Sequence, residues 1–447
     1  MTVILRTMPL ILVIFFVIVL MVSGWFDPVE FPDTASYVAA AASSNPWGEP
    51  RHPLYGCFLK ILSDAGVGSA FVPAINLFIH FVAVIALFYA TLAYGMDRLA
   101  ALAVAGAAIF NQCLVTWGHA IMPEMVSVSL LIAAFAIIVV AALNRWFWPM
   151  AFAFGVFLGL SYMLRPIMLP AVLLLPLLFG VLSKMSTKEW RVGRIVALMI
   201  VAVVPFFAQS VYRYHKVGDF NIVSFGGFGI TGMTAQLLTP DVIERLPEAH
   251  RPLARRLLDA KQKGIDEQTV TPLFRNSSGQ RSFQTTALDG FDALSRNFDE
   301  IMWGQATRLK RADESWVAFN ARMGALNGAI LRSLPERWAL WVVGASARLV
   351  GRLITYNVSF LLVCLAFCGV AIFNIIRSGS ALTGAMGTSW TPLVLIVGSW
   401  VLCTTPLTVI AAFPALRYID TGGLMLTAVP LYGLFLALRK TNNAAPV

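Results

Sequence analysis

The sequence predicts an all-α polytopic membrane protein with about ten transmembrane helices, and three observations carry this prediction. The 447-residue chain is 58% hydrophobic and only 13% charged, whereas soluble globular chains contain roughly 45–50% apolar and about 25% charged residues. Its mean hydropathy is +0.76. Apolar runs of about 20 residues, the length that a helix needs to cross a bilayer, recur along the chain. This composition argues against a soluble enzyme, a nucleic-acid-binding domain and a disordered protein.

The hydropathy pattern places the predicted spans in order along the chain. The eighth apolar stretch is long enough to contain two elements. The first is longer than the apolar core of about 7–15 residues in a signal peptide, so we expect it to be retained as a transmembrane helix. The predicted spans are residues 7–24, 70–94, 99–118, 124–143, 147–163, 167–183, 195–213, 340–376, 391–413 and 421–438.

Basic residues gather in alternate short loops. The 33 basic and 23 acidic residues give a formal net charge of +10. The loops predicted to be cytoplasmic contain Arg98, Arg145, Lys184, Lys188, Arg191, Arg194, Arg377, Arg439 and Lys440. By the positive-inside rule this bias places both ends of the chain in the cytoplasm. The opposite, outer loops contain Arg51, Lys60, Arg165 and Arg417. These four cations have no topological role, and they suit an anionic lipid or a phosphate substrate.

Two long outer segments divide the chain into three regions. Residues 1–213 form an N-terminal transmembrane module, whose first loop, 25–69, contains two stretches typical of short amphipathic helices on the membrane surface. Residues 214–339 carry charges of both signs with helical apolar spacing, and they predict a small helical cap on the outer face. Its Gly-rich segment 225–232 is expected to be irregular. Residues 340–447 return to the membrane.

The first outer loop contains the first candidate site residues. Asp33 follows a proline and precedes Thr-Ala-Ser-Tyr. It is either a first-turn acid that stabilises the next helix or a base that takes a proton from an acceptor hydroxyl. Arg51 and His52 are cations or donors at the headgroup level, where they either contact lipid or bind a phosphate. Tyr55, which completes the same motif, is a further substrate-binding candidate or an interfacial aromatic.

The remaining candidates lie at the outer ends of later spans. Glu124 opens the fourth span, and it is either a functional carboxylate or an acid that satisfies the helix dipole. His119 lies just before it in Trp-Gly-His. Arg165 lies between two apolar spans, so it binds a phosphate or pairs with Glu124 or Asp33. Arg417, in the last outer loop, is an anchor or another cation of the same site.

Several motifs are absent from the sequence. There is no GxxxxGK[ST] segment and no strand-GxGxxG-helix unit, so no domain for ATP or a nucleotide sugar is predicted. There is no HExxH motif and no paired-cysteine metal spacing, so no metal site is predicted from motifs. If the protein is a transferase, it would need a substrate that already carries its leaving group, since no domain for a nucleotide-activated donor is predicted.

The candidate residues resemble the pattern of a known superfamily. The order Pro-Asp-Thr-Ala-Ser-Tyr at 32–37, Arg-His-Pro-Leu-Tyr at 51–55, an acid at 124 and Arg-Pro at 165–166 is similar to the GT-C glycosyltransferases. These include protein O-mannosyltransferases, aminoarabinose transferases that act on lipid A, and arabinosyltransferases. The resemblance covers mainly residues 1–213 and implies the GT-C fold.

The resemblance also implies a function and roles for the residues. It implies transfer of a sugar, with inversion, from a polyprenyl-phosphate donor to an envelope glycan, lipid or protein. The site would face the periplasm of a bacterial inner membrane. Asp33 matches the acid proposed as base, Arg51 and Arg165 match positions that meet the donor phosphate, and Glu124 matches a second acid. Arg417 loosely matches a late Arg-Tyr element.

The resemblance leaves the cofactor and two other functions open. Some members of the superfamily use a divalent cation, and Asp33 with Glu124 offers carboxylate ligands to Mg²⁺ or Mn²⁺. An O-antigen polymerase or ligase would also use a lipid-linked donor. A lipid or solute transporter is a third reading, although the notable charges gather at one membrane face rather than near the midplane. No nucleic-acid partner is expected.

Overall fold

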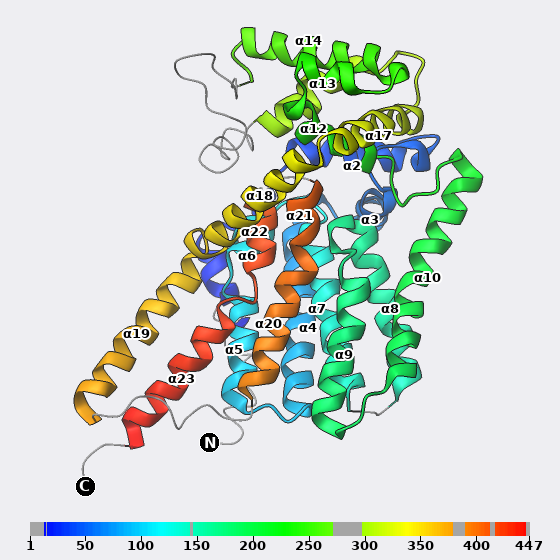
Figure 1. Cartoon of the computed structure of the whole chain (residues 1–447). Helices are drawn as coiled ribbons and strands as arrows, with labels where there is room; N and C mark the ends of the chain where they lie inside the picture. Colours follow the sequence, from blue (N-terminus) through cyan, green and yellow to red (C-terminus); the bar gives the residue numbers. More distant parts are fainter. Residues whose placement is uncertain are drawn as a thin grey trace.

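A computed structural model of the chain describes residues 13–14, 16–143, 146–270, 297–378, 389–411 and 416–443. The described chain is helical, apart from turns and one isolated β-bridge between Val29 and Ala120. The helices form a bundle with a smaller group of helices, the cap, at one end (Figure 1). The junction between α9 (Ala171–Thr187) and α10 (Val192–Val217), where many of the basic residues lie, is at the opposite end (Figure 1).

The prediction of a polytopic helical membrane protein is confirmed. Within the described residues, nine helical segments are long and apolar enough to cross a membrane. They are Ser69–Ala93, Arg98–Trp117, Glu124–Ala141, Phe147–Leu164, Pro166–Thr187, Val192–Val217, Val358–Ile376, Trp390–Ile410 and Arg417–Arg439. The first predicted span, 7–24, lies partly outside the described residues, and residues 16–22 of it are helical.

The bundle is built from helices of both membrane regions. The first region contributes α4 (Val72–Ala93), α5 (Arg98–Ile109), α6 (Gln112–Trp117), α7 (Glu124–Ala141), α8 (Phe147–Leu164), η3 (Pro166–Met168), α9 (Ala171–Thr187) and α10 (Val192–Val217). The last region contributes α18 (Pro335–Thr355), α19 (Val358–Ser378), α20 (Trp390–Thr404), α21 (Pro406–Ala411), α22 (Leu416–Gly423) and α23 (Ala428–Asn443). The helices of the first region, together with α20 and α23, bury their apolar faces in one core, whereas α18, α21 and α22 contribute buried side chains to a second core.

Three apolar runs contain breaks that hydropathy does not reveal. The predicted span 99–118 is divided into α5 and α6 because the Asn111 side chain accepts the N–H of Leu114 and starts a new helix. The eighth stretch is two helices, α18 and α19, as its length allowed, and α18 is not among the candidate spans. The run 391–413 is likewise divided, into α20 and α21.

The first outer loop folds as two short helices, as the sequence predicted. These are α2 (Pro32–Ala42) and α3 (Pro53–Asp64), with 3₁₀ turns η1 (Pro46–Gly48) and η2 (Ser69–Phe71). Proline at the first position starts both helices, where its missing N–H costs no hydrogen bond. The two helices cross at Gly56, where a Cβ would lie 2.3 Å from the Tyr37 carbonyl oxygen and 2.5 Å from the Ala41 Cβ.

The cap is a smaller group of helices, and its apolar core also includes buried side chains of α18, α21 and α22. Its elements are α11 (Gly226–Gly229), α12 (Thr231–Leu237), α13 (Pro240–Arg245), η4 (Glu248–His250), α14 (Arg251–Asp266), the π-helix η5 (Glu300–Gln305), η6 (Ala306–Leu309) and α17 (Trp316–Ser333). The expectation of an irregular Gly-rich segment was wrong, because 226–237 is largely helical. Its glycines allow close packing: a Cβ on Gly227 would lie 2.5 Å from the Asn320 carbonyl oxygen of α17.

The crossing of α2 and α3 gives a test of the fold. Gly56→Ala should force the helices apart and lower the free energy of unfolding by about 1–3 kcal/mol, the usual cost of overpacking. The measurement is thermal unfolding of the purified protein in detergent. Gly68→Ala is the matched control, because a Cβ there meets nothing within 4 Å. Equal Tm values for the two variants would contradict this account of the crossing.

Candidate functional site

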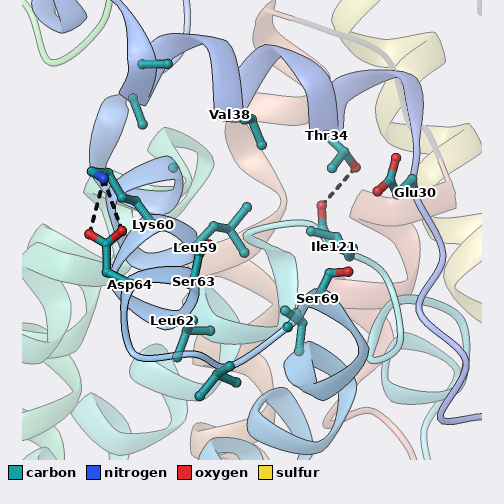
Figure 2. Close-up of a pocket in the computed structure, with 16 residues that line it drawn as sticks. Glu30, Thr34, Val38, Leu59, Lys60, Leu62, Ser63, Asp64, Ser69 and Ile121 are labelled. Atoms are coloured by element: carbon teal, nitrogen blue, oxygen red, sulfur yellow. Dashed lines mark hydrogen bonds and ion pairs between the residues drawn. The ribbon is translucent and has the colours of Figure 1, made fainter.

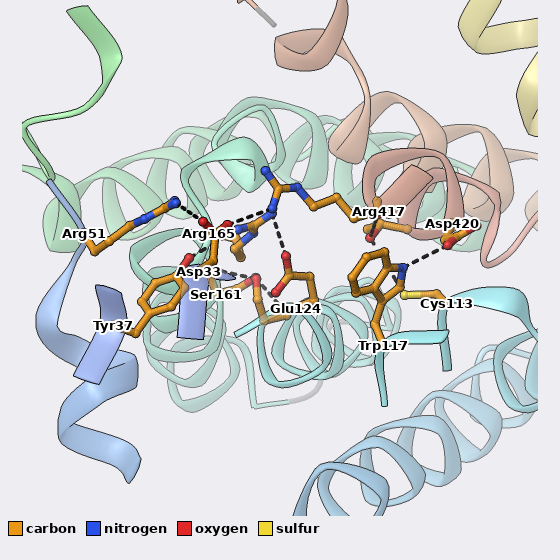
Figure 3. Close-up of polar contacts among 12 residues, drawn as sticks. Asp33, Tyr37, Arg51, Cys113, Trp117, Glu124, Ser161, Arg165, Arg417 and Asp420 are labelled. Atoms are coloured by element: carbon orange, nitrogen blue, oxygen red, sulfur yellow. Dashed lines mark hydrogen bonds and ion pairs between the residues drawn. The ribbon is translucent and has the colours of Figure 1, made fainter. Parts of the chain in front are cut away.

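Asp33 is bound by two arginines from distant parts of the chain. Its Oδ1 lies 2.6 Å from Nη2 of Arg51, and its Oδ2 lies 3.0 Å from Nη1 of Arg417. All three side chains are largely buried. Burial tends to raise the pKa of Asp33, but Arg51 and Arg417 outweigh it, so the pKa lies below its usual value. Asp33 is therefore ionised at neutral pH, with each oxygen on a guanidinium group (Figure 3).

Local structure fixes the position of Asp33 beside the start of α7. Asp33 lies in the first turn of α2, as the alternative reading of a helix-start acid expected. The preceding segment pairs with the chain before α7, since the N–H of Val29 donates to the carbonyl of His119 and the N–H of Ile121 donates to the carbonyl of Val29. The Thr34 hydroxyl adds a 2.9 Å hydrogen bond to the Ile121 carbonyl.

Glu124 and Arg165 form a buried ion pair next to Asp33. Glu124 Oε1 lies 2.9 Å from Nη2 of Arg165, and the side chains are 3% and 8% exposed. The contact lacks the direction of a hydrogen bond, so both Glu124 oxygens remain without a hydrogen-bond partner. Although burial disfavours the charged form of Arg165, Glu124 raises its pKa above the usual value. The structure thus shows the pairing with Glu124 that was one reading of Arg165.

A polar clasp between α7 and α8 positions this pair. The Ser127 hydroxyl donates to the Ser161 carbonyl at 2.9 Å, and the Ser161 hydroxyl donates back to the Ser127 carbonyl at 2.8 Å. Ser127 lies one turn from Glu124, and Ser161 lies one turn from Arg165. The two hydrogen bonds therefore fix the positions of Glu124 and Arg165 relative to each other along α7 and α8. We call Asp33, Arg51, Glu124, Arg165 and Arg417 the Asp33 cluster.

Arg417 reaches the cluster from α22. The Asp420 carboxylate, one turn away on the same helix, accepts a 2.9 Å hydrogen bond from the indole N–H of Trp117 on α6 (Figure 3). The indole of Trp400 donates to the Thr421 carbonyl at 2.8 Å. These contacts hold α22 against the bundle and direct Arg417 toward Asp33. Of the two readings of Arg417, the structure shows the one that brings it to the same cluster.

The cap closes over Arg51 with aromatic rings. The guanidinium carbon lies 5.3 Å from the ring centroids of Tyr37 and Phe225 and 5.5 Å from that of Trp303. Contacts of this kind stabilise a cation. Trp303 lies on the π-helix η5, a form that is frequent at functional sites. Phe225 and Trp303 were not found from the sequence, because their segments show only helical or Gly-rich patterns.

The cap also brings a carboxylate that sequence reasoning missed. Burial raises the pKa of Asp299, Arg417 opposes this shift, and Asp33 adds to it. The side chain is exposed, so solvent screens much of this effect. Asp299 precedes η5 and is near enough to Asp33 and Arg417 for their charges to affect its pKa. No motif surrounds it in the sequence, and only the fold of the cap places it here.

A cavity of about 200 Å³ lies against the cluster. It is lined by Arg51, His52 and Arg165, together with Tyr37, Phe225 and Tyr418. Several polar atoms around it are buried without a hydrogen-bond partner. Nε of Arg51 and Nε2 of His52 belong to residues that line the cavity, whereas Nε of Arg417, the Tyr55 hydroxyl and both Glu124 oxygens belong to neighbouring residues that do not line it. Buried polar atoms are normally satisfied, so this concentration indicates a site for a polar ligand or water.

His52 is a neutral donor rather than a cation. Its Nδ1 accepts the N–H of Leu54 at 3.1 Å and so caps α3. Burial lowers the pKa of His52 from 6.5 to about 4, and the positive charge of Arg213 acts in the same direction. Of the two readings of His52, cation or donor, the lowered pKa favours the donor. Because Nδ1 accepts, Nε2 carries the hydrogen and can donate into the cavity.

Tyr55 and His119 have different surroundings. Tyr55 is 1% exposed, and its ring packs 5.5 Å from that of Tyr37. Burial raises its pKa, so its hydroxyl stays protonated. The His119 ring lies 5.4 Å from the Trp25 ring, and burial lowers its pKa. In the described part of the chain, the structure gives His119 no contact with the charges of the Asp33 cluster.

A larger cavity of about 690 Å³ lies between α2, α3 and the start of α4 (Figure 2). It is lined mainly by apolar side chains, with Glu30 and the exposed pair of Lys60 and Asp64. None of the charges of the Asp33 cluster lines it. The smaller cavity is therefore the candidate site, because Arg51 and Arg165 of the Asp33 cluster line it together with His52.

The residues around Asp33 do not fit a divalent cation in this arrangement. Asp33 and Glu124 each face arginines, whose positive charge repels a metal ion. Among the described residues, no group of three or more His, Cys, Asp or Glu side chains is placed to hold a metal. We derive no chemical step through Mg²⁺ or Mn²⁺.

The lowered pKa of His52 predicts a loss of stability in acid. The unfolded chain binds this proton near pH 6.5 and the folded protein only near pH 4, so His52 contributes stability above pH 6.5 that is lost as the pH falls toward 4. His52→Asn retains an acceptor for the helix cap but does not titrate. In thermal unfolding, the wild-type Tm should fall more steeply than the variant Tm over this range. Parallel curves would contradict the assignment.

The buried pair of Glu124 and Arg165 gives a second test. Glu124→Gln or Arg165→Gln alone leaves a buried charge without its partner, which costs about 3–5 kcal/mol of unfolding free energy. The double variant removes both charges and should lose less than the sum of the two single losses. A double-mutant cycle, in which the free energy of unfolding of each variant is measured in detergent, gives the interaction energy of the two side chains. Additive losses would show that the two side chains do not interact.

Searches of protein-family models, curated proteins and solved structures found no match to the chain. The function therefore has to be inferred from the chemistry of the Asp33 cluster.

Proposed function

We propose that the protein is a membrane glycosyltransferase that moves a sugar from a polyprenyl-phosphate donor to a hydroxyl group of an envelope glycan, lipid or protein. The observation that carries this proposal is the Asp33 cluster itself. Acids and arginines from α2, the first outer loop, α7, the end of α8 and α22 meet beneath the cap, beside a cavity of about 200 Å³. The resemblance to the GT-C pattern, stated from the sequence, points to the same chemistry.

The proposed reaction needs a base and a cationic site for the leaving group. Asp33 accepts the proton of the acceptor hydroxyl, and the hydroxyl oxygen forms a bond to the anomeric carbon. The bond between that carbon and the phosphate oxygen breaks, and its electron pair leaves with the polyprenyl phosphate. The phosphate thereby gains one negative charge. Displacement from the opposite side of the sugar inverts the configuration.

The arginines suit the stabilisation of that charge. A guanidinium group presents five N–H donors in a plane and remains protonated, so it matches phosphate oxygens. Preorganised donors aimed at a developing charge are commonly the largest single contribution to catalysis. Arg51, held by three aromatic rings, is preorganised in this sense. Arg165 borders the same cavity and remains charged beside Glu124.

The location follows from the same arrangement. The cluster lies at the cap end of the bundle, and the basic residues around the junction of α9 and α10 lie at the other end. By the positive-inside rule the basic end faces the cytoplasm, which supports a site on the outer side of the membrane. The resemblance to the GT-C pattern further suggests the periplasmic side of a bacterial inner membrane. A lipid-linked donor would reach it from the bilayer, and no nucleotide-binding domain would be needed.

Asp33→Asn tests the role of the base. The purified wild-type protein, in liposomes with a pool of polyprenyl-phosphate sugars and an envelope extract as acceptor, should produce a glycosylated product detected by mass spectrometry. Asp33→Asn should lower the rate at least about 100-fold, as expected for loss of a general base. Asp64→Asn is the control, since this exposed carboxylate of α3 pairs only with Lys60 in the described residues.

The outcome of this assay separates the alternatives. A product that carries one added sugar supports the proposed transfer, and a product that carries a block of sugars indicates a polymerase or ligase. Flux of lipid or solute across the liposome membrane without a product indicates a transporter. If the Asp33→Asn protein transfers sugar at the wild-type rate, Asp33 is not the base.

A further inference from the structure

In this structure the carboxylate of Asp33 and the guanidinium groups of Arg51 and Arg417 already bind one another. Each oxygen of Asp33 lies within 3.0 Å of a guanidinium nitrogen, one from Arg51 and one from Arg417. A base needs a free lone pair directed at the proton it accepts. A phosphate site needs guanidinium donors that are not already committed to a carboxylate. The two functions proposed for this cluster therefore compete for the same contacts in the ligand-free protein.

The arginines have donors that Asp33 does not satisfy. Nε of Arg51 and Nε of Arg417 are buried without a hydrogen-bond partner. A carboxylate offers two oxygens, and here each serves a different arginine. A phosphate group offers more oxygens, so it can bind the unused donors as well as those now on Asp33. His52 Nε2 and the Tyr55 hydroxyl, which are also buried without a partner, lie in the same region.

Aromatic rings hold Arg51 in place, so we expect the anion bound to it to change from the Asp33 carboxylate to a phosphate group. Rings of Tyr37, Phe225 and Trp303 surround its guanidinium group at 5.3–5.5 Å. Asp33 is a short side chain on the first turn of α2, and the hydrogen bonds that its carboxylate makes in the described structure are those to Arg51 and Arg417. A negative charge that arrives beside Asp33 repels the carboxylate and raises its affinity for a proton.

We propose that Asp33 is an internal competitor for the phosphate site. The phosphate of the lipid-linked donor takes Arg51 and Arg417 from Asp33, and the carboxylate that is released becomes free to accept the proton of the acceptor hydroxyl. This inference rests on the proposed function. It adds that donor binding activates the base, so that Asp33 is withheld from reaction until the phosphate is in place.

The test is the equilibrium binding of a radiolabelled polyprenyl phosphate to the purified full chain in detergent, with the matching polyprenol as the uncharged probe. Asp33→Asn removes the competing charge. It should bind the polyprenyl phosphate about tenfold more tightly than the wild type, the value of about one charge-assisted contact. Binding of the polyprenol should not change. Asp64→Asn, which removes an exposed carboxylate of α3, should bind both probes as the wild type does.

Arg51→Gln completes the design. It should weaken binding of the polyprenyl phosphate, and the gain from Asp33→Asn should be smaller in the Arg51→Gln background, where only Arg417 is left to be released. If Asp33→Asn does not give a folded particle in size-exclusion chromatography, Asp33→Ser, which also removes the charge, takes its place. Unchanged or weaker phosphate binding in the folded charge-removing variant would overturn the exchange. A wild-type protein that does not prefer the phosphate to the polyprenol would overturn the proposed function itself.

Discussion

The binding of one carboxylate by two arginines organises this molecule. Asp33 comes from the first outer helix, Arg51 from the loop that follows, and Arg417 from a helix near the other end of the sequence. The two ion pairs therefore join the N-terminal module to the C-terminal helices at the membrane edge. The cap rests on the same point, because two of its aromatic rings contact Arg51. The ion pairs of Asp33 with Arg51 and Arg417, together with the aromatic contacts of Arg51, thus connect all three regions of the chain.

Much of the fold was accessible from the sequence because the bilayer imposes a simple rule. A helix that crosses hydrocarbon must be long and apolar, so hydropathy locates it without any knowledge of its neighbours. Breaks inside apolar runs escape the rule. Asn111 divides a run by capping a new helix with its own side chain, and averaged hydropathy barely registers one amide group. The Gly-rich segment was misread because its glycines serve close helix packing in the cap rather than chain reversal.

The site was accessible only in part. Asp33, Glu124 and three arginines were singled out because charges at the edge of an apolar span need a reason. Pairing of Arg165 with Glu124 was one of the readings, but the binding of Asp33 by Arg51 and Arg417 was not predicted, since it depends on how α2 and α22 pack. The residue type left His52 as either a cation or a donor, and only the fold reveals the burial and the helix cap that keep it neutral. Asp299 and Trp303 belong to a polar segment in which acids and aromatics are common, so nothing marked them.

The bridge between Val29 and Ala120 has a consequence for how this chain can vary. Asp33 and Glu124 each lie four residues beyond a bridge partner, so two short connections of equal length run from one backbone pairing to the two acids. The number of residues in these two connections therefore determines how far apart the two acids lie. Insertion or deletion of a single residue in either connection would rotate one carboxylate away from its arginine, while changes of length elsewhere in the first loop would leave that separation intact.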